Sequence, residues 1–308
     1  MNSISINNSP VTLTDRESNL IYQIRHVTEY RYSEPIRENL MEVRKHPLSN
    51  HNQRCLNFSL TLDPEVRVFR YVDHLGNVVH HFDVPWVHQE LSICGESVVE
   101  VKAPSESPAL SWEALQSALE QHDFYDMLQS SQLVAPCPEL DVLCAELQLS
   151  SQTLATPDAL VQAAVKGLSE RFSYRRDTTA VDTPVAAVIR QRSGLCQDFA
   201  HVLLGLLRHF RIPCRYISGY RYFNEEQQRD TSHAWVEAYV AESGWVGFDP
   251  SRGGTVDESY ICNCVGRDYA DCPPTRGIYR GNATGSLRYA VQVHPAEEAA
   301  HEDRFIRR

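Results

Sequence analysis

Long apolar runs, an export signal and an excess of basic residues are all missing from this sequence. No run approaches the roughly 20 apolar residues that a membrane-spanning helix needs, so we expect no membrane partner. Residues 1–19 are polar and lack the apolar stretch of a secretory signal, which leads us to expect a cytoplasmic protein. Lys and Arg number 29 against 40 Asp and Glu, for a net charge of −11. We therefore expect no nucleic-acid partner, because such binders carry a basic surface.

A disulfide framework is also absent from the pattern of the nine cysteines. An odd number of cysteines without an export signal predicts free thiols in a reducing compartment. Cys262, Cys264 and Cys272 form a C-x-C-x7-C pattern, but zinc sites take four ligands, usually with wider Cys pairs. We expect these three residues to pack in a core. His80 and His81 would point to opposite faces of a strand, so we predict no metal and no other cofactor.

The first third of the chain has the pattern of an antiparallel β domain. Hydrophobic residues make up 42% of the whole chain, which is enough for a sizeable core. Between residues 22 and 101, short runs alternate apolar and polar side chains, as half-buried strands do. Residues 73–77, Asp-His-Leu-Gly-Asn, supply a turn between two such runs. We predict a β-sandwich-like domain at residues 20–103, preceded by a flexible arm at residues 1–19.

The composition changes at residues 103–108, which are rich in Pro and Ser, and helical spacing of apolar residues follows. Thr156 and Pro157 predict a helix start, with a capping hydroxyl followed by proline at the first helical position. A strongly amphipathic helix is predicted from Cys196 until Pro213 stops it.

Three strands are predicted after that helix, and a polar turn at residues 224–230 separates the first from the second. They cover residues 214–222, 233–240 and 244–250. A helix followed by an antiparallel sheet is α+β layering. We predict the α+β class overall, with a catalytic domain at residues 104–295 and a C-terminal tail at residues 296–308.

Cys196 has a physical reason to be reactive. It lies at the first turn of its predicted helix, just after Gly194. Free N–H groups and the positive end of the helix dipole stabilise a thiolate there. The same N–H groups can donate to an oxyanion that forms beside the sulfur.

A base and an orienting group follow Cys196 at suitable places. His233 begins a predicted strand 37 residues later, and Asp249 ends the next strand after 16 more. If these strands are adjacent and antiparallel, the two side chains are neighbours at one sheet edge. Separately, each residue has an ordinary structural explanation: a packed thiol, a structural histidine and an Asp-Pro turn. Their order and contexts together favour a Cys–His–Asp triad.

Other residues near Cys196 are weaker candidates. Gln191 could supply a side-chain oxyanion donor, and Gln197 could bind substrate or the oxyanion. Asp198 could bind a substrate amine or modulate the thiolate, or it could simply be an acid favoured in a first helical turn. Trp235 is expected to point away from His233 along the strand and to pack in the core.

Several segments resemble a known family. Three of them resemble the core of the transglutaminase-like superfamily: residues 194–201 (GLCQDFAH), 232–237 (SHAWVE) and 247–251 (GFDPS). Tyr30-Arg31-Tyr32 and residues 73–77 resemble the N-terminal β domain of the bacterial members, and residues 266–277 resemble the segment after their catalytic Asp. The resemblance covers about residues 20–295.

The resemblance implies a papain-like thiol fold in which Cys196 is the nucleophile, His233 the base and Asp249 the orienting group. It implies an acyl-enzyme formed on a peptide or other amide-containing substrate. We predict hydrolysis, as in a cysteine peptidase or amidase, because no sequence feature marks an amine-acceptor site. Transfer to an amine, as in a transglutaminase, and a non-catalytic binding scaffold are the alternatives. The acidic net charge favours a neutral or cationic substrate.

Overall fold

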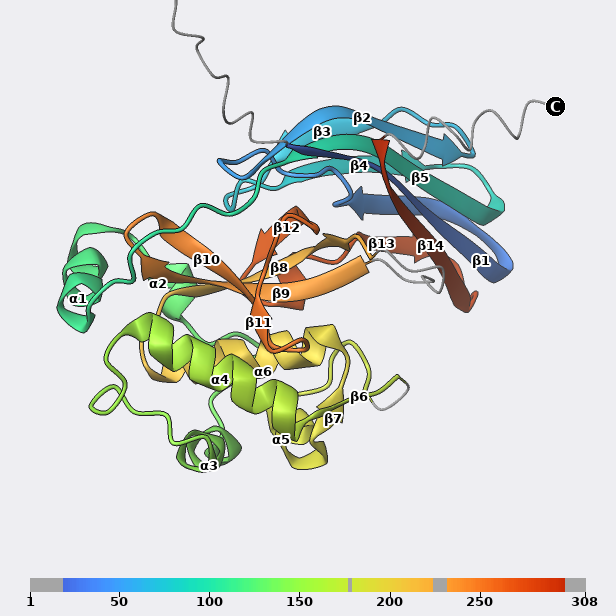
Figure 1. The fold of residues 1–308 in the computed structure, drawn as a ribbon. Helices are drawn as coiled ribbons and strands as arrows, with labels where there is room; N and C mark the ends of the chain where they lie inside the picture. Colours follow the sequence, from blue (N-terminus) through green and yellow to red (C-terminus); the bar gives the residue numbers. More distant parts are fainter. Residues whose placement is uncertain (1–18, 177–178, 224–231, 297–308) are drawn as a thin grey trace, which may run out of the picture.

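Two β-rich units pack on one another in the computed structural model, which describes residues 19–176, 179–223 and 232–296 (Figure 1). The predicted α+β class is confirmed, with an antiparallel β half-barrel joined to a core of helices and sheet. Apart from residues 19 and 296, the expected N-terminal arm and C-terminal tail lie outside the described residues, as does the expected turn at 224–230. None of the helices in the described ranges is long and apolar enough to cross a membrane.

The half-barrel is built around one long strand, β1 (Leu20–Val43). Its other strands are β2 (Gln53–Asp63), β3 (Phe69–Val72), β4 (Val78–Val84), β5 (His88–Val101), β13 (Thr275–Arg280) and β14 (Gly285–Pro295). The first part of β1 pairs with β5 and β14, and its second part pairs with β4 and β13. The register shifts between Arg31 and Ile36, around Pro35. Since proline cannot donate to a ladder, the strand bends there and the sheet curves.

The strand pairing divides the chain differently from the predicted catalytic domain at residues 104–295. Strands β13 and β14 lie beside β1, so residues 275–295 complete the half-barrel rather than the second unit. Val291 and Val293 of β14 pack with Tyr22 and Ile24 of β1. The reason is that β1 has two edges to pair, and local alternation cannot indicate which sheet a distant strand will join.

The second unit is a five-stranded antiparallel sheet with helices on one side. The sheet has the order β11-β10-β9-β8-β12, with β8 (Cys214–Arg221), β9 (Ser232–Ala241), β10 (Gly244–Asp249), β11 (Gly254–Thr255) and β12 (Tyr260–Gly266). The helices are α1 (Trp112–Gln121), α2 (Tyr125–Leu128), α3 (Pro138–Glu146), α4 (Pro157–Arg171), α5 (Val185–Gln191) and α6 (Cys196–His209). Two short strands, β6 (Ser173–Tyr174) and β7 (Ser193–Gly194), pair in parallel, and a 3-10 turn covers Tyr269–Asp271.

Helix α6 lies at the centre of this unit. It packs on β8 and β9 and is covered by α3, α4 and α5. Its apolar positions, including Phe199, Leu203 and Leu206, are fully buried. The sheet therefore lies between the helices and the half-barrel, which gives three layers (Figure 1). Burial of α6 on all sides fixes the position of its first residue, Cys196.

Two amide side chains of the half-barrel cover β12, the edge strand of the second sheet. Gln53 donates to the Cys262 carbonyl at 2.8 Å and accepts from its N–H at 2.7 Å. Asn77, the last residue of the 73–77 turn, does the same for Val265 at 2.8 and 2.7 Å. Each amide replaces a missing neighbouring strand, so the edge is closed by side chains.

A buried polar cluster also joins the two units. The Lys45 ammonium donates to the His26 carbonyl at 3.1 Å, the Thr28 hydroxyl at 2.7 Å and the Ile93 carbonyl at 2.9 Å. His26 Nδ1 lies 2.9 Å from the hydroxyl of Tyr220, on β8. Burial, and then the charge of Lys45, lower the pKa of His26 well below its usual range. Burial lowers the pKa of Lys45 to about 7.

The cysteines of the C-x-C-x7-C pattern are all buried. Burial raises the pKa of the Cys262 and Cys272 thiols well above the ordinary value. Across residues 19–176, 179–223 and 232–296, no group of three or more His, Cys, Asp or Glu side chains could hold a metal ion.

Candidate active site

Cys196 is held at the N-terminus of α6 by the residues on either side of it. Asp198 accepts hydrogen bonds from the Leu195 N–H at 2.7 Å and from the Thr179 hydroxyl at 2.7 Å. A Cβ on Gly194 would lie only 2.6 Å from the Asp198 side chain, so glycine is needed at this position. Asp198 therefore folds back over the first turn, and its hydrogen bonds are those of a first-turn acid.

The two glutamines proposed from the sequence have other surroundings. The Gln197 amide donates to the Val181 carbonyl at 2.8 Å, so it holds the segment that precedes α5. Gln191 is the exposed last residue of α5. Among the described residues, no hydrogen bond joins either side chain to His233 or Asp249.

The structure brings Cys196, His233 and Asp249 together at one end of the second sheet. His233 lies near the start of β9, and Asp249 ends the neighbouring antiparallel strand β10. His233 Nε2 lies 2.6 Å from Asp249 Oδ2. The other ring nitrogen therefore remains for Cys196, whose thiol interacts with the imidazole.

Asp249 is buried and accepts hydrogen bonds from two further side chains. The Ser251 hydroxyl donates to Oδ1 at 2.6 Å, and the Tyr260 hydroxyl donates to Oδ2 at 2.8 Å. Burial alone would raise the pKa of this carboxyl, but these donors and His233 hold it below its usual range. Tyr260 was not predicted from the sequence, because β12 reaches the site through pairing with β8 rather than with its chain neighbour.

The charges of Cys196 and His233 stabilise one another. Burial alone would raise the pKa of the Cys196 thiol, yet the charge and hydrogen bond of His233 and the Ala234 N–H hold it below its ordinary value. Burial would lower the pKa of His233, but the Cys196 thiolate and the Asp249 carboxylate raise it to about 10. The arrangement favours a thiolate–imidazolium pair, which is the reactive form of a cysteine nucleophile.

Tyr174 is a further residue at the site. It ends β6 and pairs in parallel with Gly194 of β7, two residues before Cys196. Tyr174 is 52% exposed, and its hydroxyl lies close to Cys196. Burial, together with the Cys196 charge, raises its pKa. A strand of two residues gives too short a pattern to be found in a sequence.

The orientation of Trp235 relative to His233 differs from the prediction. It is buried, as predicted, but its ring lies 6.5 Å from the His233 ring at an interplanar angle of 26°. The two residues are separated by two positions on one strand, and such residues share a face of the sheet. Trp235 therefore forms part of the floor beneath His233.

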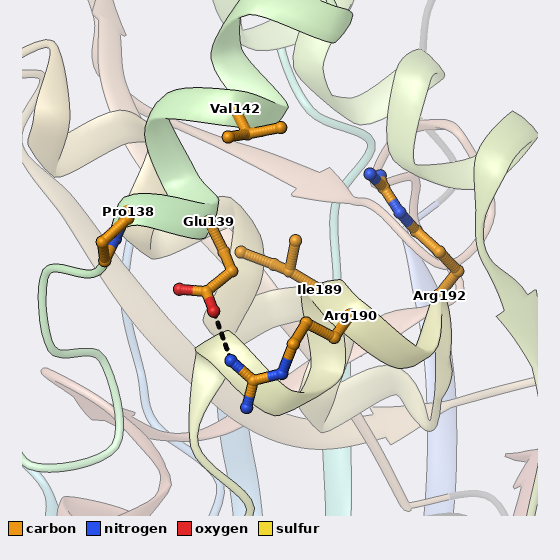
Figure 2. A pocket seen from close by; sticks show the side chains of 6 residues that line it. All are labelled: Pro138, Glu139, Val142, Ile189, Arg190 and Arg192. Atoms are coloured by element: carbon orange, nitrogen blue, oxygen red, sulfur yellow. Dashed lines mark hydrogen bonds and ion pairs between the residues drawn. The ribbon is translucent and has the colours of Figure 1, made fainter.

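A hollow between α3 and α5 lies apart from these residues (Figure 2). Its lining includes none of Cys196, His233 and Asp249. Arg190 and Glu139 form an ion pair across it (Figure 2), and Arg192 pairs with Glu146 at 2.6 Å. Both arginines are thus paired with carboxylates of α3.

Comparison with known proteins identifies both units. Residues 22–100 match the bacterial transglutaminase-like N-terminal region, and residues 147–250 match the transglutaminase-like superfamily. The second match contains Cys196, His233 and Asp249.

Relatives and solved structures extend the likeness to most of the chain. An uncharacterized protein of Mycobacterium leprae is 31% identical over 88% of this chain and 97% of its own length. A protein-glutamine gamma-glutamyltransferase of Pseudomonas aeruginosa is 32% identical, but over only 37% of this chain and 18% of its own. The crystal structure of a candidate cysteine protease from Cytophaga hutchinsonii superposes with a TM-score of 0.74 at 20% identity, covering 90% of this chain and 91% of that one. The chain therefore belongs to the transglutaminase-like superfamily and carries the bacterial transglutaminase-like N-terminal region ahead of its core.

Proposed function

We propose that this protein is a cysteine hydrolase that cleaves a peptide or amide bond through a thioester intermediate. The observation that carries the proposal is the connected chain of Cys196, His233 and Asp249, with the cysteine at a helix N-terminus. A thiol with a lowered pKa, a charged base and a buried orienting carboxylate are the parts that nucleophilic acyl transfer requires.

In the first half of the reaction, the Cys196 thiolate attacks the carbonyl carbon of the substrate amide. A carbon–sulfur bond forms, and the carbonyl electron pair moves to oxygen. The His233 imidazolium then gives its proton to the amide nitrogen, the carbon–nitrogen bond breaks, and the amine leaves. Asp249 keeps the imidazole oriented and stabilises its charge throughout.

The oxyanion of the intermediate needs hydrogen-bond donors near Cys196. The Cys196 backbone N–H belongs to the first turn of α6, whose N–H groups have no partner within the helix. The Tyr174 hydroxyl lies close to the same residue, so a substrate oxygen beside the thiol would meet both donors. We assign Tyr174 as the second oxyanion donor.

In the second half of the reaction, water resolves the thioester. Neutral His233 removes a proton from water, the hydroxide attacks the thioester carbonyl, and the carbon–sulfur bond breaks. A carboxylic acid leaves, and the thiolate–imidazolium pair is restored. Water is our preferred acceptor because no feature of the described site marks a place for an amine.

Mass spectrometry of a peptide library can test both the reaction and the acceptor. The wild-type protein and Cys196→Ala would each be incubated with the library, with and without a primary amine. We expect free-acid products and a transient adduct on Cys196 in the wild type alone. Since one relative is named for glutamyl transfer, products that carry the added amine in place of free acids would overturn hydrolysis in favour of transfer.

A further inference from the structure

Arg221 ends β8 beside the candidate active site. Its backbone partner on β12 is Tyr260, the residue that donates to Asp249. The Arg221 guanidinium lies over the Tyr260 ring at 5.0 Å and over the Phe223 ring at 4.4 Å. One aromatic ring therefore separates this cation from the triad carboxylate, and the stacking fixes its position.

The Arg221 guanidinium has buried donors that bond to nothing. Its Nε and Nη1 atoms are both inaccessible to solvent, and neither has a hydrogen-bond partner among the described residues. Within the part of the chain that the structure describes, Arg221 forms no ion pair. Buried N–H groups of a charged side chain are costly to leave without an acceptor, so an anion that bonded this guanidinium would remove that cost.

A second guanidinium faces the same aromatic ring. Arg252 follows Asp249 by three residues, its N–H donates to the Asp249 carbonyl at 3.2 Å, and its side chain lies 5.8 Å from the Phe223 ring. The described residues hold no ion pair to Arg252 either. In the nearby segment before β12, Oδ1 of Asp257 accepts hydrogen bonds from the backbone N–H and the hydroxyl of Ser259.

We propose that Arg221 and Arg252 form a subsite for a carboxylate of the substrate, so that the preferred substrates are acidic peptides. This inference rests on the proposed function, because the subsite adjoins the triad through Tyr260 and Asp249. A guanidinium binds a carboxylate through two parallel hydrogen bonds, and peptides carry carboxylates on Asp and Glu side chains or at the C-terminus. The local charge thus reverses the expectation, drawn from the net charge of −11, of a neutral or cationic substrate.

Three small electrophiles can test the subsite on the full chain without a known substrate. Chloroacetyl-Glu-amide carries a side-chain carboxylate, chloroacetyl-Gln carries a terminal carboxylate, and chloroacetyl-Gln-amide is neutral. In each case the Cys196 thiolate displaces chloride, so a carbon–sulfur bond forms as the carbon–chlorine bond breaks. The rate constant for alkylation of Cys196 is measured by mass spectrometry, and the faster of the two acids reveals the source of the carboxylate.

We expect at least one acidic reagent to alkylate Cys196 about tenfold faster than the neutral amide. In Arg221→Gln that ratio should fall to about one, and in Arg252→Gln to about three. Arg31→Gln is the matched control, because it removes one positive charge from an exposed position on β1 and should leave the tenfold ratio unchanged. Melting curves check the fold of each variant, and Arg252→Gln alone decides the matter if Arg221→Gln does not fold.

Two different failures are distinguishable. Rapid labelling of Cys196 with no preference for a carboxylate would overturn the subsite and leave the proposed function standing. A preference for a carboxylate that both arginine variants retain would also overturn the subsite and leave the proposed function standing. If all three reagents label Cys196 only as fast as an ordinary free thiol, the proposed function falls and the subsite falls with it.

Discussion

His233 and His26 are both buried, yet their surroundings shift their pKa values in opposite directions. The His233 side chain is 8% exposed and His26 is 4% exposed. His233 lies between a thiol and a carboxylate, and its pKa is raised to about 10. His26 lies beside the Lys45 ammonium, and its pKa is lowered well below the usual range. Burial disfavours charge on both imidazoles. At His233 the neighbouring thiolate and carboxylate outweigh burial, whereas at His26 burial is the main cause of the lowered pKa and the Lys45 charge adds to it.

The two regions use this difference for different purposes. At the end of the second sheet, a charged imidazole between Cys196 and Asp249 is ready to donate a proton. At the contact between the units, a neutral imidazole bonds Tyr220 while Lys45 is surrounded by neutral oxygens. The cluster around His233 is suited to proton transfer, and the cluster around His26 holds the two units together. The following substitutions distinguish these two roles.

Cys196→Ala should have the largest effect, because it removes the nucleophile. We expect turnover of a peptide or amide substrate to fall at least about 10⁴-fold. The free energy of unfolding should change by less than about 1 kcal/mol, since only one partly buried sulfur is lost. A variant that folds and retains most of its activity would contradict the role of this thiol.

Asp249→Asn should have the next largest effect. An amide in place of the carboxylate no longer holds the protonated His233, so we expect a loss of about 10²–10⁴-fold in kcat. The fall of activity at alkaline pH, which the wild type should show near the His233 pKa of about 10, should move to lower pH. A pH–rate profile measures both effects. An unchanged alkaline limb would show that Asp249 does not sustain the charge on His233.

Lys45→Met should change the pH dependence of stability rather than the chemistry. The pKa of Lys45 is lowered to about 7 in the folded protein, against about 10.4 in an unfolded chain. Between these values the unfolded chain binds a proton that the folded protein does not, so this group adds stability as pH rises. From pH 7 to 10, the unfolding free energy of the wild type should gain about 2–4 kcal/mol on that of Lys45→Met.

Urea unfolding at several pH values measures that gain. Lys166→Met is the matched control, because Lys166 lies exposed on α4 and its side chain is 74% accessible. This control should follow the wild type at every pH. A Lys45→Met curve parallel to that of the wild type would mean that Lys45 stays charged in the folded protein.

Tyr260→Phe should have the smallest effect on the triad. It removes one of the hydrogen bonds to Asp249, so we expect kcat to fall about 3–10-fold, in keeping with about 1 kcal/mol for one hydrogen bond. Tyr71→Phe is a fair control, because its hydroxyl also donates to a carboxylate, that of Glu42, but in the half-barrel. If both variants have equal activity, Tyr260 does not support the site.

Local sequence patterns were enough to indicate which residues the fold brings together at the site. A cysteine at a helix start, a histidine at a strand start and an aspartate at a strand end each have a local signature. The same reasoning identified α6 from its apolar spacing, and the buried positions agree. Such residues can be read from a sequence because short connections place consecutive strands side by side.

Features that depend on distant pairing were missed or misplaced. Tyr260 reaches Asp249 only because β12 lies next to β8, and Tyr174 reaches Cys196 only through a parallel pair of two-residue strands. Residues 275–295 fall within the predicted catalytic domain at 104–295, yet they pair with β1, which lies at the other end of the chain. The orientation of Trp235 was a separate error of strand periodicity, since alternate residues share a face.

Nitrogen NMR of the histidine rings tests the central comparison most directly. Spectra of protein with ¹⁵N-labelled histidine would be recorded at about pH 8, and the variants His233→Gln and His26→Gln would assign the two rings. We predict that both nitrogens of His233 carry protons at that pH, whereas His26 carries only one. A neutral His233 ring in the folded wild-type protein would contradict the thiolate–imidazolium pair on which the proposed chemistry depends.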